Sequence, residues 1–303
     1  MKHKLIKIQD DVFNCTRTLY IKGRPVFRWV RQKLIVDKLN LINNALSYQL
    51  NSNLNRITAR GTSKELQEVQ IKLLPVLNKL CKNNNLTYWL DFGTLIGAAR
   101  NGSFIPWDDD IDVSMLRTDF ERILNLEKQL PSNYYFDAKD RSDIIGLKNK
   151  NLPKNIGLDI FCADMIKNDI SLTDALNISK NIINIQSNTP HKTKIKTLKE
   201  VDNFLAQNKI LKTNNLNEAN SIMYGPGFCH HTHPSIILKK SNIFPLKTIK
   251  FEGCDYPCPN NIDVHLSLLY KDYLSADWSK LPHNQVSDLA VEELIQIKQF
   301  LNQ

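Results

Sequence analysis

The strongest constraint on the fold of this chain is a dense group of carboxylates among apolar residues. Four aspartates occupy five consecutive positions, Asp108-Asp-Asp-Ile-Asp112. Their alternation with apolar residues predicts a strand from Asp108 to Met115, in which Asp108, Asp110 and Asp112 share one face. Three carboxylates on one face repel one another unless a cation neutralises them.

In this strand Asp109 would point away from the shared face. An acidic turn on a solvated face is the plain alternative. The apolar neighbours Pro106, Trp107 and Ile111 favour a buried setting. An EF-hand-like calcium loop is disfavoured, because counting from Asp108 places Val113 at the sixth position, where such a loop requires glycine. Carboxylate oxygens suit Mg²⁺ or Mn²⁺, which bridge to substrate phosphates, so we expect one of these as cofactor.

Two further features fit phosphoryl chemistry. Gly93-Thr94 forms a turn at which the backbone can approach a phosphate closely, with amide groups and a hydroxyl as donors. Asp159 lies in an apolar segment, Leu158–Phe161, where a lone charge needs a partner such as a metal. Asp91, just before the turn, is interpreted as a structural hydrogen-bonding residue.

Hydrophobic periodicity predicts an α+β fold. The expected helices cover residues 25–50, 62–82 (containing Pro75 and opened by a capping box at Thr62), 118–130, much of 171–219, 263–270 and 287–301. The expected strands cover residues 86–92, 108–115, 134–137, 144–148 and 157–161, with a hairpin at 244–259. We therefore expect a basic helical N-terminal extension (1–61), a mixed sheet flanked by helices (62–165) and a mostly helical C-terminal part that binds donor and acceptor (166–303).

The net charge of +9 belongs entirely to the first 60 residues, which hold twelve Lys or Arg and three Asp. This segment has three interpretations: an amphipathic helix on an anionic membrane surface, a dock for an acidic glycolipid, or an ordinary helical cap on the core. Nucleic acid is a disfavoured partner. With no apolar run of roughly 18 residues and no secretory signal, we expect a cytoplasmic protein, in contact with the inner face of the membrane if residues 1–60 bind it.

The motifs together resemble the LicD/fukutin family. The resemblance rests first on Tyr88-Trp-Leu-Asp-Phe-Gly-Thr-Leu-Ile-Gly-Ala-Ala-Arg100 and Gly102-Ser-Phe-Ile-Pro-Trp-Asp-Asp-Asp-Ile-Asp-Val113. It continues at Leu158–Phe161 and in short segments up to His283. Two departures stand out: Lys271 replaces the usual glycine after Tyr270, and residues 171–220 match nothing in the pattern.

The resemblance implies a nucleotidyltransferase-like fold and the transfer of a phospho-head group from a CDP-linked donor. Family members transfer phosphocholine from CDP-choline, or ribitol phosphate from CDP-ribitol, to glycans, so CDP-choline and a surface glycan such as lipopolysaccharide are the expected partners. Asp110 and Asp112 match the paired metal ligands, with Asp159 as third carboxylate and Asp108 as a further ligand. Gly93 and Thr94 match the phosphate-binding turn.

Three other residues are candidate substrate contacts: Arg100, Lys148 and His283. For Arg100 the plainer alternative is a surface salt bridge. For His283 the roles of acid, base and acceptor contact all stay open. Arg117 has the same ambiguity as Arg100. The Cys and His residues between 229 and 258 invite a zinc interpretation, but their spacing is not that of a standard zinc finger.

Two alternative functions stay open. The same fold can transfer a nucleotide from an NTP to a small acceptor, which would release pyrophosphate instead of CMP. A non-catalytic glycan-binding protein is disfavoured by Asp110, Asp112 and Asp159, because unused buried charges are costly.

Overall fold

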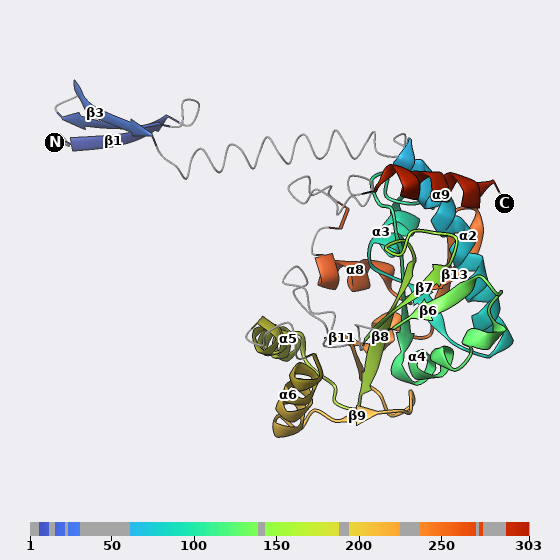
Figure 1. Ribbon diagram of the computed structural model, residues 1–303. Coiled ribbons are helices and arrows are strands. Elements are labelled where there is room, and N and C mark those ends of the chain that lie inside the picture. Colours follow the sequence, from blue (N-terminus) through green and yellow to red (C-terminus); the bar gives the residue numbers. More distant parts are fainter. Residues whose placement is uncertain are drawn as a thin grey trace. The chain divides into compact units, whose positions relative to one another are not determined.

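The structure, a computed structural model, describes residues 6–11, 16–21, 24–30, 61–138, 143–187, 194–224, 237–270, 273–274 and 289–302 (Figure 1). The chain forms two compact units. One contains Met1–Arg56 and Ser275–Trp278, and the other contains Ile57–Leu274 and Ser279–Gln303. Among the described residues, no helix has both the length and the apolarity required to cross a membrane.

The first unit contains a three-stranded antiparallel sheet of β1 (Ile6–Asp11), β2 (Thr16–Ile21) and β3 (Arg24–Val30). The predicted helix from residue 25 is therefore wrong as far as Val30, and residues 31–60 lie outside the described part. Ile21 pairs with Arg24, so only Lys22 and Gly23 join β2 to β3. A two-residue connection with glycine between runs of β-branched and aromatic residues is a hairpin signal that outweighed the helical spacing.

The second unit is built on an eight-stranded mixed sheet whose central strand is β8 (Leu158–Ile166). β8 pairs in parallel with β5 (Ile111–Leu116) and antiparallel with β7 (Ile144–Asn149). The remaining members are β4 (Tyr88–Leu90), β6 (Tyr134–Asp137), β9 (Lys212–Thr213), β10 (Ser221–Tyr224) and β11 (Ile237–Lys239). Because β10 pairs with β8, residues on both sides of position 165 share this sheet.

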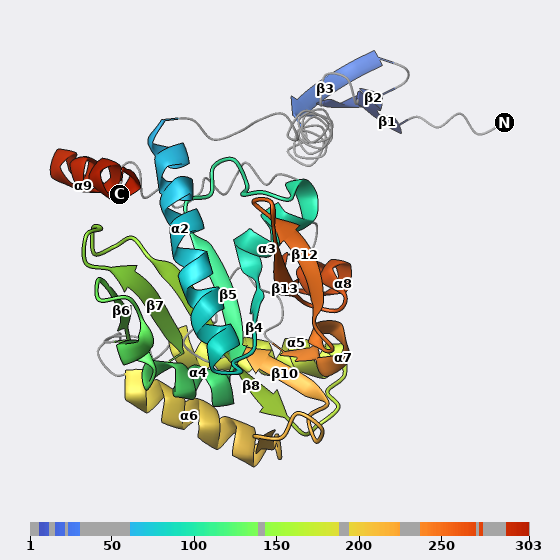
Figure 2. The same cartoon turned by 90° about the vertical axis from the view of Figure 1, so that its right-hand side faces the viewer.

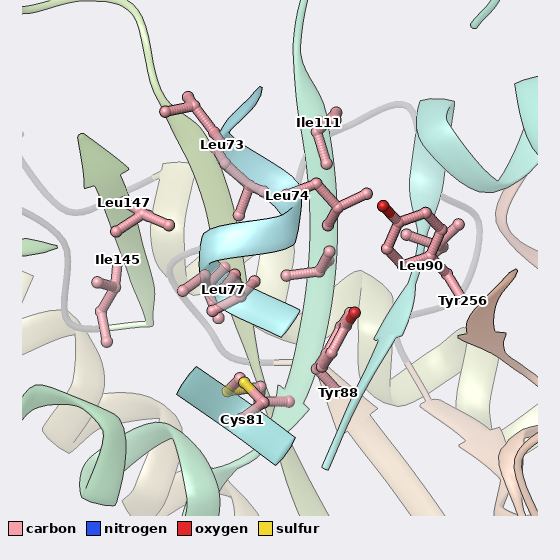
Figure 3. Packing of buried hydrophobic residues seen from close by; sticks show 14 of the residues in the cluster. Leu73, Leu74, Leu77, Cys81, Tyr88, Leu90, Ile111, Ile145, Leu147 and Tyr256 are labelled. Atoms are coloured by element: carbon pink, nitrogen blue, oxygen red, sulfur yellow. The ribbon is translucent and has the colours of Figure 1, made fainter. Parts of the chain in front are cut away.

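The long helix α2 (Thr62–Asn83) lies along one face of the sheet (Figure 2). Its buried Leu73, Leu74 and Leu77 pack against Ile111 and Leu147, which come from two strands (Figure 3). The predicted helix over 62–82 is confirmed and continues through Pro75. The expected capping box is not formed, since Gly61 is the N-cap and makes no side-chain cap bond.

Short helices and a hairpin complete the unit. They are α3 (Phe92–Asn101), α4 (Arg117–Leu124), the 3₁₀ helix η1 (Glu127–Gln129), α5 (Leu172–Ser187), α6 (Lys194–Gln207), α7 (Lys240–Ile243), α8 (Ile262–Tyr270), α9 (Val291–Leu301) and the hairpin β12–β13 (Lys247–Phe251, Cys254–Cys258). Helix α8 lies beside α3, and α5 lies beside α6. The α+β class and the mixed sheet are confirmed. The C-terminal part is less helical than predicted, because its strands β10 and β11 extend the central sheet.

Candidate active site

The predicted carboxylates converge at the start of β5, although by a different route from the one expected. The strand begins at Ile111, so Asp108 and Asp110 lie in the connection before it and only Asp112 lies within it. Oxygen atoms of Asp108, Asp109 and Asp110 lie within 4.8 Å of one another. Strict alternation along a strand therefore does not apply here, and Asp109 joins its neighbours instead of facing away.

Asp159 reaches the same place from β8. It is the register partner of Asp112 in the parallel pair of β5 and β8. Burial raises the pKa of Asp112 well above its usual range, and the charges of Asp110, Asp159 and Asp108 raise it further. The four predicted carboxylates therefore lie close enough to repel one another.

This group of carboxylates fits a hard divalent cation. Burial, followed by the charge and hydrogen bond of Asp110, raises the pKa of Asp108 well above its usual range. Oδ2 of Asp108 is buried and makes no hydrogen bond within the described structure. Buried oxygen atoms normally have a partner, and an all-oxygen donor set is what Mg²⁺ and Mn²⁺ prefer.

The Gly93 turn lies against these carboxylates. A Cβ atom on Gly93 would stand 2.7 Å from Oδ2 of Asp108, so the carboxylate or the turn would have to shift to admit it. The next residue, Thr94, is buried, and its Oγ1 accepts a hydrogen bond from the backbone N–H of Asp112 at 2.9 Å. Gly93 thus permits a close approach, and Thr94 orients the first residues of β5. A phosphate contact for either residue stays a prediction.

Lys148 lies next to Asp159 on the neighbouring strand. A Cβ atom on Gly146 would lie 3.0 Å from Cε of Lys148 and 3.7 Å from Oδ1 of Asp159, so both side chains border this glycine. Gly157 also leaves room for Lys148, since its Cβ would lie 2.9 Å from Cγ of the lysine. The ammonium group is 3.2 Å from Oδ2 of Asp137 and donates to the carbonyl of Lys154.

The other predicted contacts differ in outcome. Arg100 is half-buried in the last turn of α3, where burial lowers its pKa. Arg117 is a structural residue, because its guanidinium donates to Asp143 at 2.8 Å and to Asp164, both of them buried. His283 lies outside the described residues. So does much of the zinc interpretation, of which the structure describes only the exposed Cys254 and the buried Cys258.

A buried network behind the turn centres on Asp91, whose interpretation as a structural hydrogen-bonding residue is confirmed. Its Oδ2 accepts from Trp89 Nε1 at 2.8 Å and from Tyr224 Oη at 2.5 Å. Its Oδ1 accepts from the N–H of Phe92 at 2.9 Å and lies 2.7 Å from Nε2 of His265. Burial by itself would raise the pKa of Asp91, but the charge and hydrogen bond of His265, with the hydroxyl of Tyr224, lower it overall.

Sequence reasoning missed Tyr224, His265 and the placement of Tyr270. Tyr224 lies on the unpredicted strand β10, whereas His265 was visible as a lone histidine in an apolar predicted helix. Burial raises the pKa of Tyr270 well above its usual range, and the charge of Asp112 is the next cause. This tyrosine, at the end of α8, is therefore near the carboxylates.

Comparison with known proteins finds similarity in the part of the chain that contains these residues. Residues 85–161, which contain the Gly93 turn and all four carboxylates, match the LicD/FKTN/FKRP nucleotidyltransferase domain. The chain is 42% identical over 74 residues to the lipopolysaccharide cholinephosphotransferase LicD of Haemophilus influenzae, which is 24% of this chain and 28% of that protein. It is 53% identical over 32 residues to the human ribitol 5-phosphate transferase FKRP, which is 11% of this chain and 6% of that protein.

These similarities are local. The matched stretch spans less than a third of the Haemophilus protein's length. The solved structure of a lincosamide antibiotic adenylyltransferase, LnuA, aligns with 74% of this chain and 92% of its own chain. The two are 13% identical and superpose poorly, with a TM-score of 0.27. The chain is therefore similar to the LicD/FKTN/FKRP family through the domain at residues 85–161.

Proposed function

We propose that this protein transfers a phospho-head group, phosphocholine above all, from a CDP-linked donor to a hydroxyl of a cell-surface glycan such as lipopolysaccharide. The observation that carries the proposal is the convergence of Asp108, Asp110, Asp112 and Asp159 beside the Gly93 turn. The names of the relatives support a phospho-head group, and the name of the Haemophilus relative supports a lipopolysaccharide acceptor.

In the proposed reaction, the acceptor hydroxyl oxygen bonds to the distal phosphorus of the donor. The bond from that phosphorus to the bridging oxygen breaks, and CMP leaves with the electron pair. The hydroxyl proton passes to a carboxylate or to water. Atoms and charge balance without any further reactant.

Each residue has a defined part in this proposal. Asp108, Asp110 and Asp112 would hold Mg²⁺ or Mn²⁺, which when bound supplies positive charge to the phosphate oxygens and the leaving group. Asp159 serves as a further ligand or as the proton acceptor. Either role requires that its carboxylate lie near that of Asp112, its partner in the strand register. The backbone at Gly93 approaches the donor phosphates, and Lys148 provides a cation beside Asp159.

The location is also proposed. We place the reaction in the cytoplasm, with residues 1–60 in contact with an anionic membrane surface or glycolipid. The support for this is their surplus of nine positive charges, twelve basic residues against three acidic ones. Co-sedimentation with anionic liposomes, comparing the whole chain with a chain lacking residues 1–60, tests the contact; equal binding by both would contradict it.

Calorimetric titration with CDP-choline, CDP-ribitol and CTP, with Mg²⁺ or with chelator, tests the reaction class. We expect Mg²⁺-dependent binding of one CDP conjugate in preference to CTP, and release of CMP when an acceptor glycan is added. The variant Asp112→Asn should lose both, whereas Asp255→Asn, an exposed residue paired with Lys250, should behave like wild type. Preference for CTP with release of pyrophosphate would indicate nucleotide transfer, and no binding of any nucleotide would favour a glycan-binding protein.

A further inference from the structure

The buried pair of Asp91 and His265 joins two distant parts of the chain behind the carboxylates. Both side chains are fully buried, and Nε2 of His265 is 2.7 Å from Oδ1 of Asp91. An ionised aspartate only accepts hydrogen bonds, so His265 donates through Nε2. Its Nδ1 has no hydrogen-bond partner within the described structure. The hydrogen bond of the ring to Asp91 is therefore made by Nε2.

Asp91 begins a strained turn. It is the N-cap of α3, and the next residue, Phe92, has a φ of +47°, in the left-handed region that non-glycine residues avoid. Such a conformation is disfavoured for a non-glycine residue and persists only where its surroundings enforce it. Here Oδ1 of Asp91 binds the N–H of Phe92, and the Phe92 ring packs against Phe161 and Tyr224 with centroid distances of 4.9 and 5.4 Å.

The turn contacts the backbone of Asp112 and the carboxylate of Asp108. The backbone N–H of Asp91 donates to the carbonyl of Asp112 at 3.1 Å, and Thr94 accepts from the N–H of Asp112 at 2.9 Å. Gly93 lies against Oδ2 of Asp108. A shift of the turn therefore moves both Asp108 and Asp112.

We propose that His265 is a positioning residue for the carboxylate site: by donating to Asp91, it holds the turn from Asp91 to Thr94 against Asp108 and Asp112. This inference rests on the proposed function for its consequence, the affinity for a divalent cation. Its structural part concerns the turn alone and is measured without any ligand.

The test uses two variants of His265 in the full-length protein and one matched control. His265→Leu keeps the volume and removes the donor, whereas His265→Gln keeps a donor that reaches as far as Nε2. Leu205→Ala, the control, creates a cavity at a similarly buried residue of α6, a helix that lies apart from α3 (Figure 1). Thermal unfolding confirms that all three are folded and shows how far each is destabilised.

The first readout is hydrogen–deuterium exchange of peptides covering residues 91–97 and 110–116, with no metal or nucleotide. We expect exchange in these peptides to become about tenfold faster in His265→Leu, to return towards wild type in His265→Gln, and to stay unchanged in Leu205→Ala. Unchanged exchange in His265→Leu would overturn the inference, as would equal acceleration in the Leu205→Ala control.

The second readout is Mn²⁺ affinity, measured from the electron paramagnetic resonance signal of the free ion. Residues that orient metal ligands typically change affinity by roughly 10–100-fold, so we expect a loss of that order in His265→Leu but not in His265→Gln or Leu205→Ala. Wild-type affinity in His265→Leu despite faster exchange would overturn the link to the carboxylates. Failure of the wild type to bind Mn²⁺ would count against the proposed function, while the exchange experiment still decides whether His265 holds the turn.

Discussion

Asp112 on β5 lies opposite Asp159 on β8 in the register of the parallel strand pair, and the charge of Asp159 helps to raise the pKa of Asp112. The raised pKa of Asp112 means that its charge destabilises the metal-free fold. We expect Asp112→Asn to raise the unfolding midpoint by a few degrees in chelator, yet to lower transfer by at least ~100-fold. Thermal unfolding and release of CMP measure the two effects, and a destabilised variant that keeps its activity would contradict both.

A side chain at position 93 has no room. The Cβ of Gly93→Ala would lie 2.7 Å from Oδ2 of Asp108, so the carboxylate or the turn must move. Overpacking of this kind costs about 1–3 kcal/mol, measurable by urea unfolding, and we expect a weaker affinity for Mn²⁺ as well. Ala99→Ser, at an exposed position of the same helix, is the control; equal effects of both substitutions would refute the close approach.

Lys148 offers a prediction with a neighbouring control. Loss of a charge-assisted bond to a phosphate costs about 1.5–3 kcal/mol, so Lys148→Met should weaken donor binding by roughly 10- to 100-fold. Lys150→Met removes an exposed lysine that bonds the carbonyl of Ser132, and it should leave donor binding unchanged. Calorimetric titration of the donor compares them, and equal affinities would remove Lys148 from the site.

Arg117 should matter for stability. Arg117→Met leaves Asp143 and Asp164 buried without this partner, a change that costs about 3–5 kcal/mol when a buried pair is broken. The pair of Arg122 and Asp119 is the comparison: Asp119 is buried, but the Arg122 side chain is 55% exposed, and pairs open to solvent contribute about 0–1 kcal/mol. Urea unfolding of Arg117→Met and Arg122→Met should show this difference, and similar losses would contradict it.

The Asp91 network predicts a pH dependence of stability. The pKa of Asp91 is lowered in the folded state, so its ionised form stabilises the fold above the unfolded-state pKa of about 3.9. This contribution disappears as the pH falls through the folded-state pKa. The stability difference between wild type and Asp91→Asn should therefore be largest near neutral pH and shrink below about pH 4. Urea unfolding from neutral pH to well below pH 4 measures this difference, and a constant difference would mean that the charge of Asp91 does not contribute.

Much of the fold and of the candidate site was predictable because it depends on the order of residue types over short segments of the chain. The periodicity of α2, the hairpin of β12 and β13 and the α+β class followed from the spacing of apolar residues. The carboxylates and the Gly93 turn were recognisable because their residue types are contiguous. The strand at Arg24–Val30 was missed, since its apolar residues also suit helical spacing and only pairing with β2 decides between the two.

By itself, the sequence predicted which residues would hold a cation and which glycine would approach them, because both predictions depend on residue type over a few neighbouring positions. Only the tertiary structure decided that Asp112 faces Asp159 and that Arg117 is held by Asp143 and Asp164. It also brought His265 against Asp91. These pairs are separated by long stretches of chain, and their contacts arise from strand pairing and helix packing, which no local pattern encodes.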